Sequence, residues 1–482
     1  MSTAAAAATA TAGAIPETQV SPDWRAFARA MGKTGAGSIA SGLLAALATK
    51  IVAVVLGPAA IALVSTLQQI QQTALAAATL NGQTALVQGA SALVGPERRD
   101  YLRTVMGLFA LATLAIAGTM LAWPAAVARL AGLPDEHANL VRWLAIPVIL
   151  SSAFTFLNAL LRVAGEIGRL AWIQVIAAMA MALAAWPAAM AARSGHTDAR
   201  AGALVAMLGI SAAAALAGAA MAMARGRDLL KPEVVRVNGP ARSGMLRAGW
   251  HFFLVSGAML ATSLLGSAAL LAVRARVTRI SGSAATGEFD AAWGISMNHV
   301  TVILGAMQVY YLPVLARARD AAERRRHIAH GLMLAISVVA PVIAGIALTK
   351  PALISLLYSS AFEPAARYLR WTLIGDYLKV TSWVLAIPML AAADMRAFVA
   401  ADVSTQAVFW SGAWLIGRLV GHANSSAEAA AMAFTISYAV NFAVCYGYAR
   451  RRQGFRFGPR LAALWIGGLA LVSAMSLGVT GV

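Results

Sequence analysis

The sequence is a succession of apolar runs, each about 20 residues long, which is the helix length that crosses a bilayer. The chain of 482 residues is 60% hydrophobic and only 12% charged, whereas ordinary soluble domains carry about 25% charged residues. A chain this apolar cannot cover its surface with polar groups, so lipid must be its solvent. The sequence therefore predicts an all-α polytopic membrane protein.

The first long apolar run, Ile39–Val64, carries Lys50 near its middle. A lone ammonium in hydrocarbon costs at least ~2.5 kcal/mol and is kept where it faces a water-filled cavity or an anion. Gly57-Pro58 should end the helix, because Pro lacks a donor and Gly adopts unusual dihedrals cheaply. We expect a first span, a tight turn and a second span, with Lys50 directed inward. A counter-ion on another helix is the alternative.

Further apolar runs place the spans along the chain. We expect them near residues 35–56, 59–93, 104–127, 139–161, 170–192, 201–224, 248–273, 291–315, 328–349, 368–392, 397–420 and 429–449, and the run 461–480 leaves a thirteenth span open. The longest polar connection, Arg225–Arg247, divides the first twelve into six plus six. Two six-helix halves around a central substrate site are a common transporter plan.

This division gives five segments: a disordered tail (1–32), an N-terminal six-helix bundle (33–225), a cytoplasmic linker (226–247), a C-terminal six-helix bundle (248–452), and a basic turn with an extra apolar helix (453–482). A weak repeat relates the two bundles. Lys50 precedes Gly57 by seven residues in the first, and Arg274 precedes Ser281-Gly282 in the second.

The formal charge of +19 would suggest nucleic acid as the partner of a soluble protein. Here the basic residues gather in alternate short loops, the pattern that marks cytoplasmic loops of membrane proteins. We therefore expect a cytoplasmic N-terminus and no nucleic-acid partner. Arg274, Arg276 and Arg279 break the alternation, because they are expected in an outer loop after the seventh span.

Motifs for chemistry are missing from the sequence. The single cysteine, Cys445, excludes an internal disulfide or CxxC site, and the seven histidines show no ligand spacing. There is no GxSxG motif, P-loop or pair of metal-binding carboxylates. We expect a transporter, not an enzyme, with no catalytic residue, metal or cofactor. Without a nucleotide site, transport is passive or driven by a Na⁺ or H⁺ gradient.

Polar residues within two spans are candidates for the substrate site. In the second span, Gln68 and Gln72 share one helical face, close to Ser65 and Gln69. They could hydrogen-bond to neighbouring helices or form a wall for sugar hydroxyls. In the tenth span, Asp376 and Lys379 stand at i and i+3. A buried structural salt bridge is the favoured interpretation, and a charge pair lining the cavity is the other.

Three blocks of sequence resemble a known family, the lipid flippases of O-antigen and enterobacterial common antigen. KIVAVVLGPAAIALVSTLQQI, from Lys50, is similar to the family's first signature. GEFDAAWGISMNHVTVILGAMQVYYLP, from Gly287, is similar to its eighth helix. The segment 353–403 resembles its ninth-to-eleventh helix region, with Phe-Glu-Pro and Gly-Asp-Tyr-Leu-Lys blocks. The resemblance covers roughly residues 33–452.

The resemblance implies membership of the superfamily of multidrug and toxin extrusion transporters and lipid II flippases, with two six-helix bundles forming a V. It also implies a multi-pass protein of the bacterial inner membrane that moves an undecaprenyl-pyrophosphate-linked oligosaccharide to the periplasmic leaflet. Lys50 matches the basic position before Gly-Pro, Asp376 and Lys379 match the Gly-Asp block, and Arg274 matches the basic residue ending the seventh helix.

The resulting hypothesis is alternating access, with Lys50 and Arg274 holding the pyrophosphate and Gln68 and Gln72 contacting sugars. Membrane lipids and other polysaccharide assembly proteins are the expected partners. Two alternatives stay open. One is a cation-coupled multidrug exporter of the same fold, although acidic residues are few. The other is a membrane-embedded glycan polymerase or ligase, although the outer loops are short.

Overall fold

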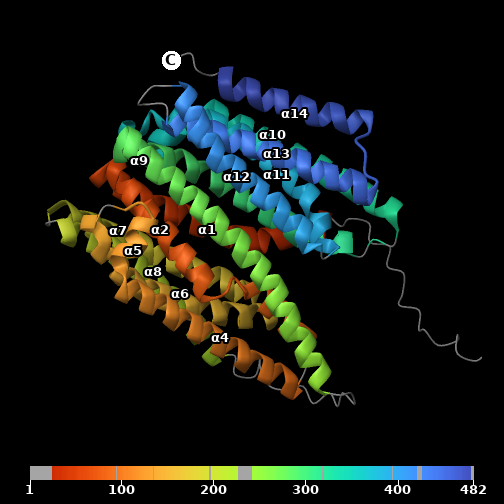
Figure 1. The fold of residues 1–482 in the computed structure, drawn as a ribbon, viewed down its shortest axis with the longest axis horizontal. Helices are drawn as coiled ribbons and strands as arrows, with labels where there is room; N and C mark the ends of the chain where they lie inside the picture. Colours follow the sequence, from red (N-terminus) through yellow and green to blue (C-terminus); the bar gives the residue numbers. More distant parts are fainter. Residues whose placement is uncertain are drawn as a thin grey trace, which may run out of the picture.

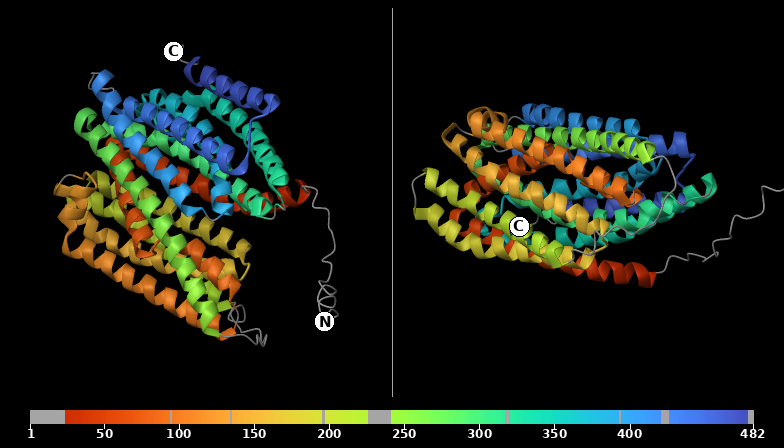
Figure 2. Two further views of the ribbon diagram at one scale, coloured as in Figure 1. Left: turned by 45° about the vertical axis from the view of Figure 1, so that its right-hand side comes forward. Right: turned by 90° about the horizontal axis from the view of Figure 1, so that it is seen from below.

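The computed structural model describes residues 24–93, 95–133, 135–194, 197–225, 241–316, 318, 320–392, 394–420 and 426–478. These residues form helices joined by short turns, and the helices separate into two bundles (Figures 1 and 2). Nine of the helices in the described ranges are long and apolar enough to cross a membrane. The predicted all-α polytopic membrane protein with two bundles is confirmed.

The N-terminal bundle is built from the helices before the connection at 226–240. They are α1 (Trp24–Leu56), α2 (Pro58–Ala78), α3 (Gln83–Ala92), α4 (Gly95–Ala122), α5 (Pro124–Leu130), α6 (Ala138–Val163), α7 (Ile167–Ser194) and α8 (Thr197–Arg225), with a 3₁₀ turn at Asp135–His137. Within this bundle α7 packs against both α1 and α8, and α6 packs against α4 and α8.

The C-terminal bundle follows that connection. It contains α9 (Ala241–Ala316), α10 (Ala321–Leu357), α11 (Ala365–Ala391), α12 (Met395–Val420), α13 (Ser426–Gln453) and α14 (Pro459–Gly478), with a 3₁₀ turn at Ser360–Phe362. Asp320 caps α10 by accepting a hydrogen bond from the amide of Glu323 at 2.6 Å. This bond holds the pKa of the Asp320 carboxyl below its usual value.

The longest element, α9, is two helices joined at Gly282, whose φ of 87° and ψ of 170° are not helical. We call residues 241–281 the first arm and 283–316 the second arm. The green helix that separates the orange and blue halves of Figure 1 belongs to α9, and residues of the first arm contact α2 and α3 of the N-terminal bundle. The first arm therefore joins the two bundles along much of its length.

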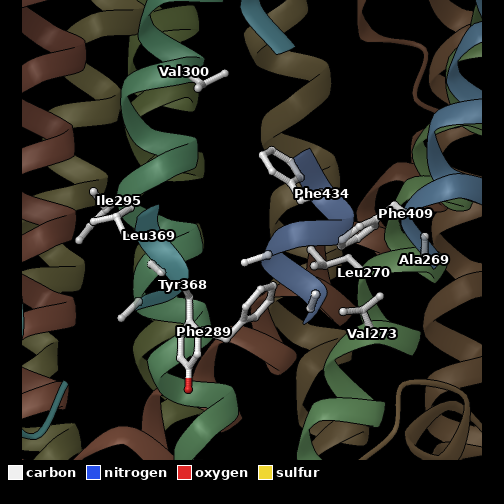
Figure 3. Close-up of a cluster of buried hydrophobic side chains, with 14 of the residues drawn as sticks. Ala269, Leu270, Val273, Phe289, Ile295, Val300, Tyr368, Leu369, Phe409 and Phe434 are labelled. Carbon is white, nitrogen blue, oxygen red and sulfur yellow. The ribbon is translucent and has the colours of Figure 1, made fainter. Parts of the chain in front are cut away.

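The core is most complete in the C-terminal bundle, where α11 carries one buried residue after another. Figure 3 shows part of this core, in which Phe434, Phe409 and Leu270 lie close together while Tyr368 and Leu369 lie beside the second arm. Large apolar side chains such as Leu111 and Leu183 are exposed on the outside, as expected of a surface that faces lipid.

Four sequence predictions need correction. The span at 59–93 is two helices, because Leu80 and Asn81 adopt positive φ values of 51° and 45°, and the Asn81 amide donates to the Met259 carbonyl at 2.8 Å. The basic cluster predicted in an outer loop, including Arg274, lies inside α9. Residues 24–32, predicted as tail, begin α1, and residues 241–247, predicted as linker, begin α9. Residues 1–23 and 226–240 lie outside the described residues.

The predicted run at 461–480 forms α14, which packs against α10 and α11 at the edge of the C-terminal bundle (Figure 1). Its length of 20 residues and mean hydropathy of 1.8 suffice for a further span. Lys350 of α10 is 2% exposed and donates to the carbonyl of Ser476 in the last turn of α14 at 2.8 Å. A cation at a helix C-terminus is stabilised by the helix dipole, so Lys350 anchors α14.

Candidate functional site

Two glycines break the chain in the same way in the two bundles. Gly57 has φ 77° and ψ −171°, and Gly282 has φ 87° and ψ 170°. This backbone region is essentially restricted to glycine. Each glycine follows a helix that carries a basic residue, Lys50 or Arg274, seven or eight positions earlier. The matching conformations support the repeat that the sequence indicates only weakly.

The break at Gly282 folds the second arm of α9 back against the first. Residues at equal distances from Gly282 therefore meet, because each helix rises about 1.5 Å per residue. Thr278 and Thr286, four positions on either side, are hydrogen-bonded at 2.8 Å. Arg274 and Asp290, eight positions on either side, form an ion pair with an Nε–Oδ1 distance of 2.7 Å.

The Arg274–Asp290 pair is buried, with side-chain exposures of 7% and 0%. The Arg274 guanidinium also donates through Nη1 to the Ser65 carbonyl of α2 at 3.3 Å. A buried charge of this kind is retained when an opposite charge and further hydrogen bonds accompany it. In this conformation Arg274 serves as an internal link between α9 and α2, and its charge is balanced by Asp290.

Lys50 lies near the end of α1 and is half-buried. Its ammonium donates a hydrogen bond to the Leu356 carbonyl, which belongs to the last turn of α10, at 2.6 Å. Carbonyls in a last helical turn lack partners within the helix and carry partial negative charge. Among the described residues no carboxylate lies within 4 Å of the Lys50 ammonium. Lys50 therefore connects the two bundles through a neutral acceptor.

The four glutamines of α2 divide into two pairs. Gln69 donates to Ser267 of α9 at 3.1 Å, and Gln71 donates to Ser151 of α6 at 3.4 Å. In the part of the chain that the structure describes, Gln68 and Gln72 form no side-chain hydrogen bond, and Gln72 is exposed. The interhelical interpretation therefore applies to Gln69 and Gln71, while contact of Gln68 and Gln72 with sugar hydroxyls stays a prediction.

Asp376 and Lys379 do not form the salt bridge that their spacing favours. Asp376 is fully buried and accepts a hydrogen bond from Ser296 at 2.8 Å, and His299 Nε2 lies 3.2 Å from its second oxygen. The Lys379 ammonium instead contacts the sulfur of Met297 at 3.2 Å. The second arm of α9 supplies all three partners, and these contacts draw the two α11 side chains apart.

Lys379 lines a cavity of about 180 Å³ within the C-terminal bundle. The cavity lies between the two arms of α9 and helices α11, α12 and α13, and its lining includes Trp293, Gln406, Phe409, Phe434 and Tyr438. The six predicted site residues therefore occupy separate places. Lys50 joins the bundles, Arg274 is buried in an ion pair with Asp290, and Asp376 is buried beside Ser296 and His299. Gln68 and Gln72 lie on α2, and Lys379 faces an internal cavity.

Sequence reasoning missed the partners of these residues, Asp290 and His299. A signal for Asp290 was present, because it stands as far after Gly282 as Arg274 stands before it. That symmetry becomes informative only when the chain is known to reverse at Gly282. His299 carries no comparable signal, since its proximity to Asp376 depends on the packing of α9 against α11.

Solved structures of similar fold include a transporter of the MOP superfamily and a lipid II flippase. A multidrug resistance MATE family transporter in an inward-facing conformation matches 88% of this chain and 95% of its own, at 16% identity and a TM-score of 0.66. The lipid II flippase MurJ, in an inward closed conformation, matches 95% of this chain and 94% of its own, at 13% identity and a TM-score of 0.64. These likenesses establish the fold.

Sequence comparison gives a narrower relationship. The lipid III flippase of Escherichia coli (strain K12) is 30% identical over 110 residues, which are 23% of this chain and 26% of that protein. The matched stretch thus spans about a quarter of this curated relative. A family model described as polysaccharide biosynthesis protein matches residues 51–367, from the end of α1 through the start of α11. On this match, the chain belongs to the polysaccharide biosynthesis protein family.

Proposed function

We propose that this protein flips an oligosaccharide linked to undecaprenyl pyrophosphate, such as an O-antigen repeat unit, from the cytoplasmic to the periplasmic leaflet of the bacterial inner membrane. The family match and the similarity of one stretch to a lipid III flippase support a lipid-linked glycan as the substrate. The fold shared with MOP superfamily transporters supports alternating access between two bundles.

The observation that carries the proposal is the environment of Lys50. Its ammonium lies between the bundles, is half-buried and has a neutral carbonyl as its partner. A pyrophosphate offers charged oxygens that are stronger acceptors than a carbonyl. Lys50 is thus available to an anionic head group in a way that Arg274 is not, because Asp290 already neutralises Arg274.

In this proposal, two close contacts between the bundles must open during transport. An added Cβ at Gly287 of α9 would lie 1.8 Å from the Pro58 carbonyl of α2, so the two backbones are in direct contact there. The hydrogen bond between Lys50 and the Leu356 carbonyl is a second contact between the bundles. Alternating access then requires these contacts to separate while the head group passes, with Gln68 and Gln72 available to sugar hydroxyls.

The proposal can be tested with purified protein in vesicles that contain a fluorescent oligosaccharide on polyprenyl pyrophosphate. Transfer to the second leaflet is followed by the fraction accessible to a membrane-impermeant quencher. Lys50→Ala should slow the transfer at least about tenfold, which corresponds to about 1.4 kcal/mol. Lys50→Arg keeps the positive charge and should retain most of the rate. Equal rates for Lys50→Ala and the unchanged protein, at equal protein level, would contradict the proposal.

Two further measurements separate the proposal from its rivals. A deletion strain that becomes sensitive to cationic drugs, with normal display of surface glycan, would indicate a multidrug exporter. Release of free lipid pyrophosphate by the purified protein would indicate a polymerase or ligase. Coupling of transport to Na⁺ or H⁺ belongs to the proposal and can be tested by imposing each gradient on the vesicles. Cooperation with other polysaccharide assembly proteins is also part of the proposal.

A further inference from the structure

The cavity beside Lys379 is separate from the contact between Lys50 and Leu356. Its walls come from the C-terminal bundle alone, with Gly266 and Leu270 on the first arm of α9, Trp293 on the second arm, and further residues on α11, α12 and α13. Its volume of about 180 Å³ is many times the space that one water needs. The cavity is therefore large enough for a small organic group.

Aromatic rings form one wall of this cavity. Trp293 and Phe409 are stacked with ring centroids 6.0 Å apart, and Phe434 meets Trp293 edge-on at 5.0 Å. Figure 3 shows Phe434, Phe409 and Leu270 close together inside the bundle. Tyr438 continues the wall, with its ring centroid 4.9 Å from that of Phe434. Flat aromatic surfaces of this kind are suited to a ring-shaped ligand with apolar faces.

Polar groups occupy the rest of the lining. Gln406 extends from α12, and its amide nitrogen lies 3.5 Å from an Asp402 oxygen, at the limit of a hydrogen bond. Thr405 and Ser437 also line the cavity, although their hydroxyls already donate to carbonyls of their own helices. Hydroxyl oxygens can accept further hydrogen bonds. The cavity thus combines aromatic faces with acceptors and donors for hydroxyl groups.

Lys379 supplies the charge of the cavity. Its ammonium lies 5.7 Å from the Phe434 ring centroid and 5.2 Å from the Tyr438 centroid, in addition to its contact with the Met297 sulfur. Such ring contacts are weak compared with an ion pair. Within the described ranges no carboxylate lies within 4 Å of this ammonium, and the nearby carboxylate of Asp402, which interacts with Lys379 over a longer distance, accepts from Gln406. The lining position of Lys379 and these neutral contacts suit it to bind an anionic group inside the cavity.

These observations point to a specific ligand. A sugar ring presents C–H faces to aromatic rings and hydroxyls to amides, and a carboxylate on the ring would pair with an ammonium. We propose that this cavity binds an acidic sugar residue of the transported glycan, with Lys379 pairing with the carboxylate and the Trp293 wall contacting the ring. The inference rests on the proposed function, and it narrows the substrate to glycans that contain a hexuronate-type sugar.

Calorimetric titration of the purified protein tests the inference with simple probes. Methyl α-glucuronide should bind at least about tenfold more tightly than methyl α-glucoside, and acetate should bind no better than the glucoside. Lys379→Met should abolish the preference for the glucuronide. Lys350→Met is the matched control, because Lys350 is also a buried lysine of this bundle but contacts Ser476 instead of the cavity. That variant should keep the preference.

Several outcomes would overturn the inference. In the unchanged protein, the inference is overturned if both glycosides bind equally or if the glucuronide does not bind. Neither result depends on a variant. Acetate binding as tightly as the glucuronide would indicate a site for small anions. Vesicle transport separates this test from that of the proposed function. A protein that flips lipid-linked glycans but shows no glucuronide preference refutes only the cavity assignment, and glucuronide binding without any flipping refutes the flippase.

Discussion

The ammonium of Lys50 in α1 donates a hydrogen bond to the Leu356 carbonyl at the end of α10, with an Nζ–O distance of 2.6 Å. The contact joins the N-terminal and C-terminal bundles, which meet here at the ends of two helices. A hydrogen bond from a charged donor contributes about 1.5–3 kcal/mol. If a pyrophosphate takes over the Lys50 ammonium, the bundles lose this contact, so substrate binding and separation of the bundles would be coupled.

Lys50→Gln should therefore favour conformations in which the bundles are apart at this end. Spin labels on cysteines at Leu130 and Leu419, which are 85% and 77% exposed on opposite bundles, would report the separation. The single native cysteine, Cys445, is buried and should remain unlabelled. We expect longer and broader distances in Lys50→Gln and unchanged distances in Lys50→Arg. Identical distributions in all three proteins would show that the contact does not hold the bundles.

Gly287→Ala should also separate the bundles, for a steric reason. The added Cβ would lie 1.8 Å from the Pro58 carbonyl, which is backbone and cannot rotate away. Overpacking of this kind typically costs about 1–3 kcal/mol. The same spin labels should report the change. Gly305→Ala, on the same arm of α9 but with open space at its Cβ position, is the control and should leave the distances unaltered.

Arg274 and Asp290 should behave as a unit in thermal unfolding. Arg274→Met alone leaves the Asp290 carboxylate buried without its partner, a change that costs about 3–5 kcal/mol in comparable ion pairs. The double variant Arg274→Met/Asp290→Leu removes both charges and should recover much of the lost stability. If the stability loss of the double variant equals the sum of the losses measured for Arg274→Met and Asp290→Leu alone, the two residues act independently.

Gly57→Ala and Gly282→Ala should destabilise the protein by similar amounts. Both glycines have positive φ and extended ψ, so a side chain would be strained by about 1–3 kcal/mol even though space is available. Gly447→Ala is the control, because that glycine lies inside α13 with no close neighbour and without a positive φ. Thermal unfolding in detergent gives the midpoint temperature of each of the three variants. Equal midpoints would show that Gly57 and Gly282 tolerate a side chain as well as Gly447 does.

The attachment of α14 can be tested at two adjacent glycines. A Cβ at Gly468 would approach the Tyr377 hydroxyl to 2.6 Å, and this hydroxyl donates to the Trp465 carbonyl of α14 at 2.8 Å. Gly468→Val should lower the thermal midpoint by displacing α14 from α11. Gly467→Val introduces the same side chain where the added Cβ meets no close atom. A loss of stability in both variants alike would reflect helix propensity instead of packing.

The spans and the division into two bundles could be predicted because they depend on local properties. A run of about 20 apolar residues must form a helix in lipid, since its backbone groups have no other partners there. The failures also have local causes. Leu80 and Asn81 break a helix inside an apolar run, and the basic residues after 273 continue a helix, although in a sequence they resemble a loop.

The partners of the charged residues could not be predicted in the same way. The spacing of Asp376 and Lys379 is compatible with a salt bridge on α11, but Ser296, Met297 and His299 approach from α9 and bind the two side chains separately. Neighbours on one helix contribute only about 0.2–0.5 kcal/mol per pair. Buried contacts from another helix can exceed that amount, so they decide where each charge points.

The sequence by itself determined that the chain is helical, embedded in lipid and broken at Gly57, because apolar length and the conformational limits of glycine and proline act over short distances. The tertiary structure alone decided that Arg274 is neutralised by Asp290, that Lys50 meets a carbonyl of the opposite bundle, and that Lys379 faces a cavity. Each of these depends on which helices pack together, and the free energy of a buried charge is set by the groups that packing brings within a few ångströms.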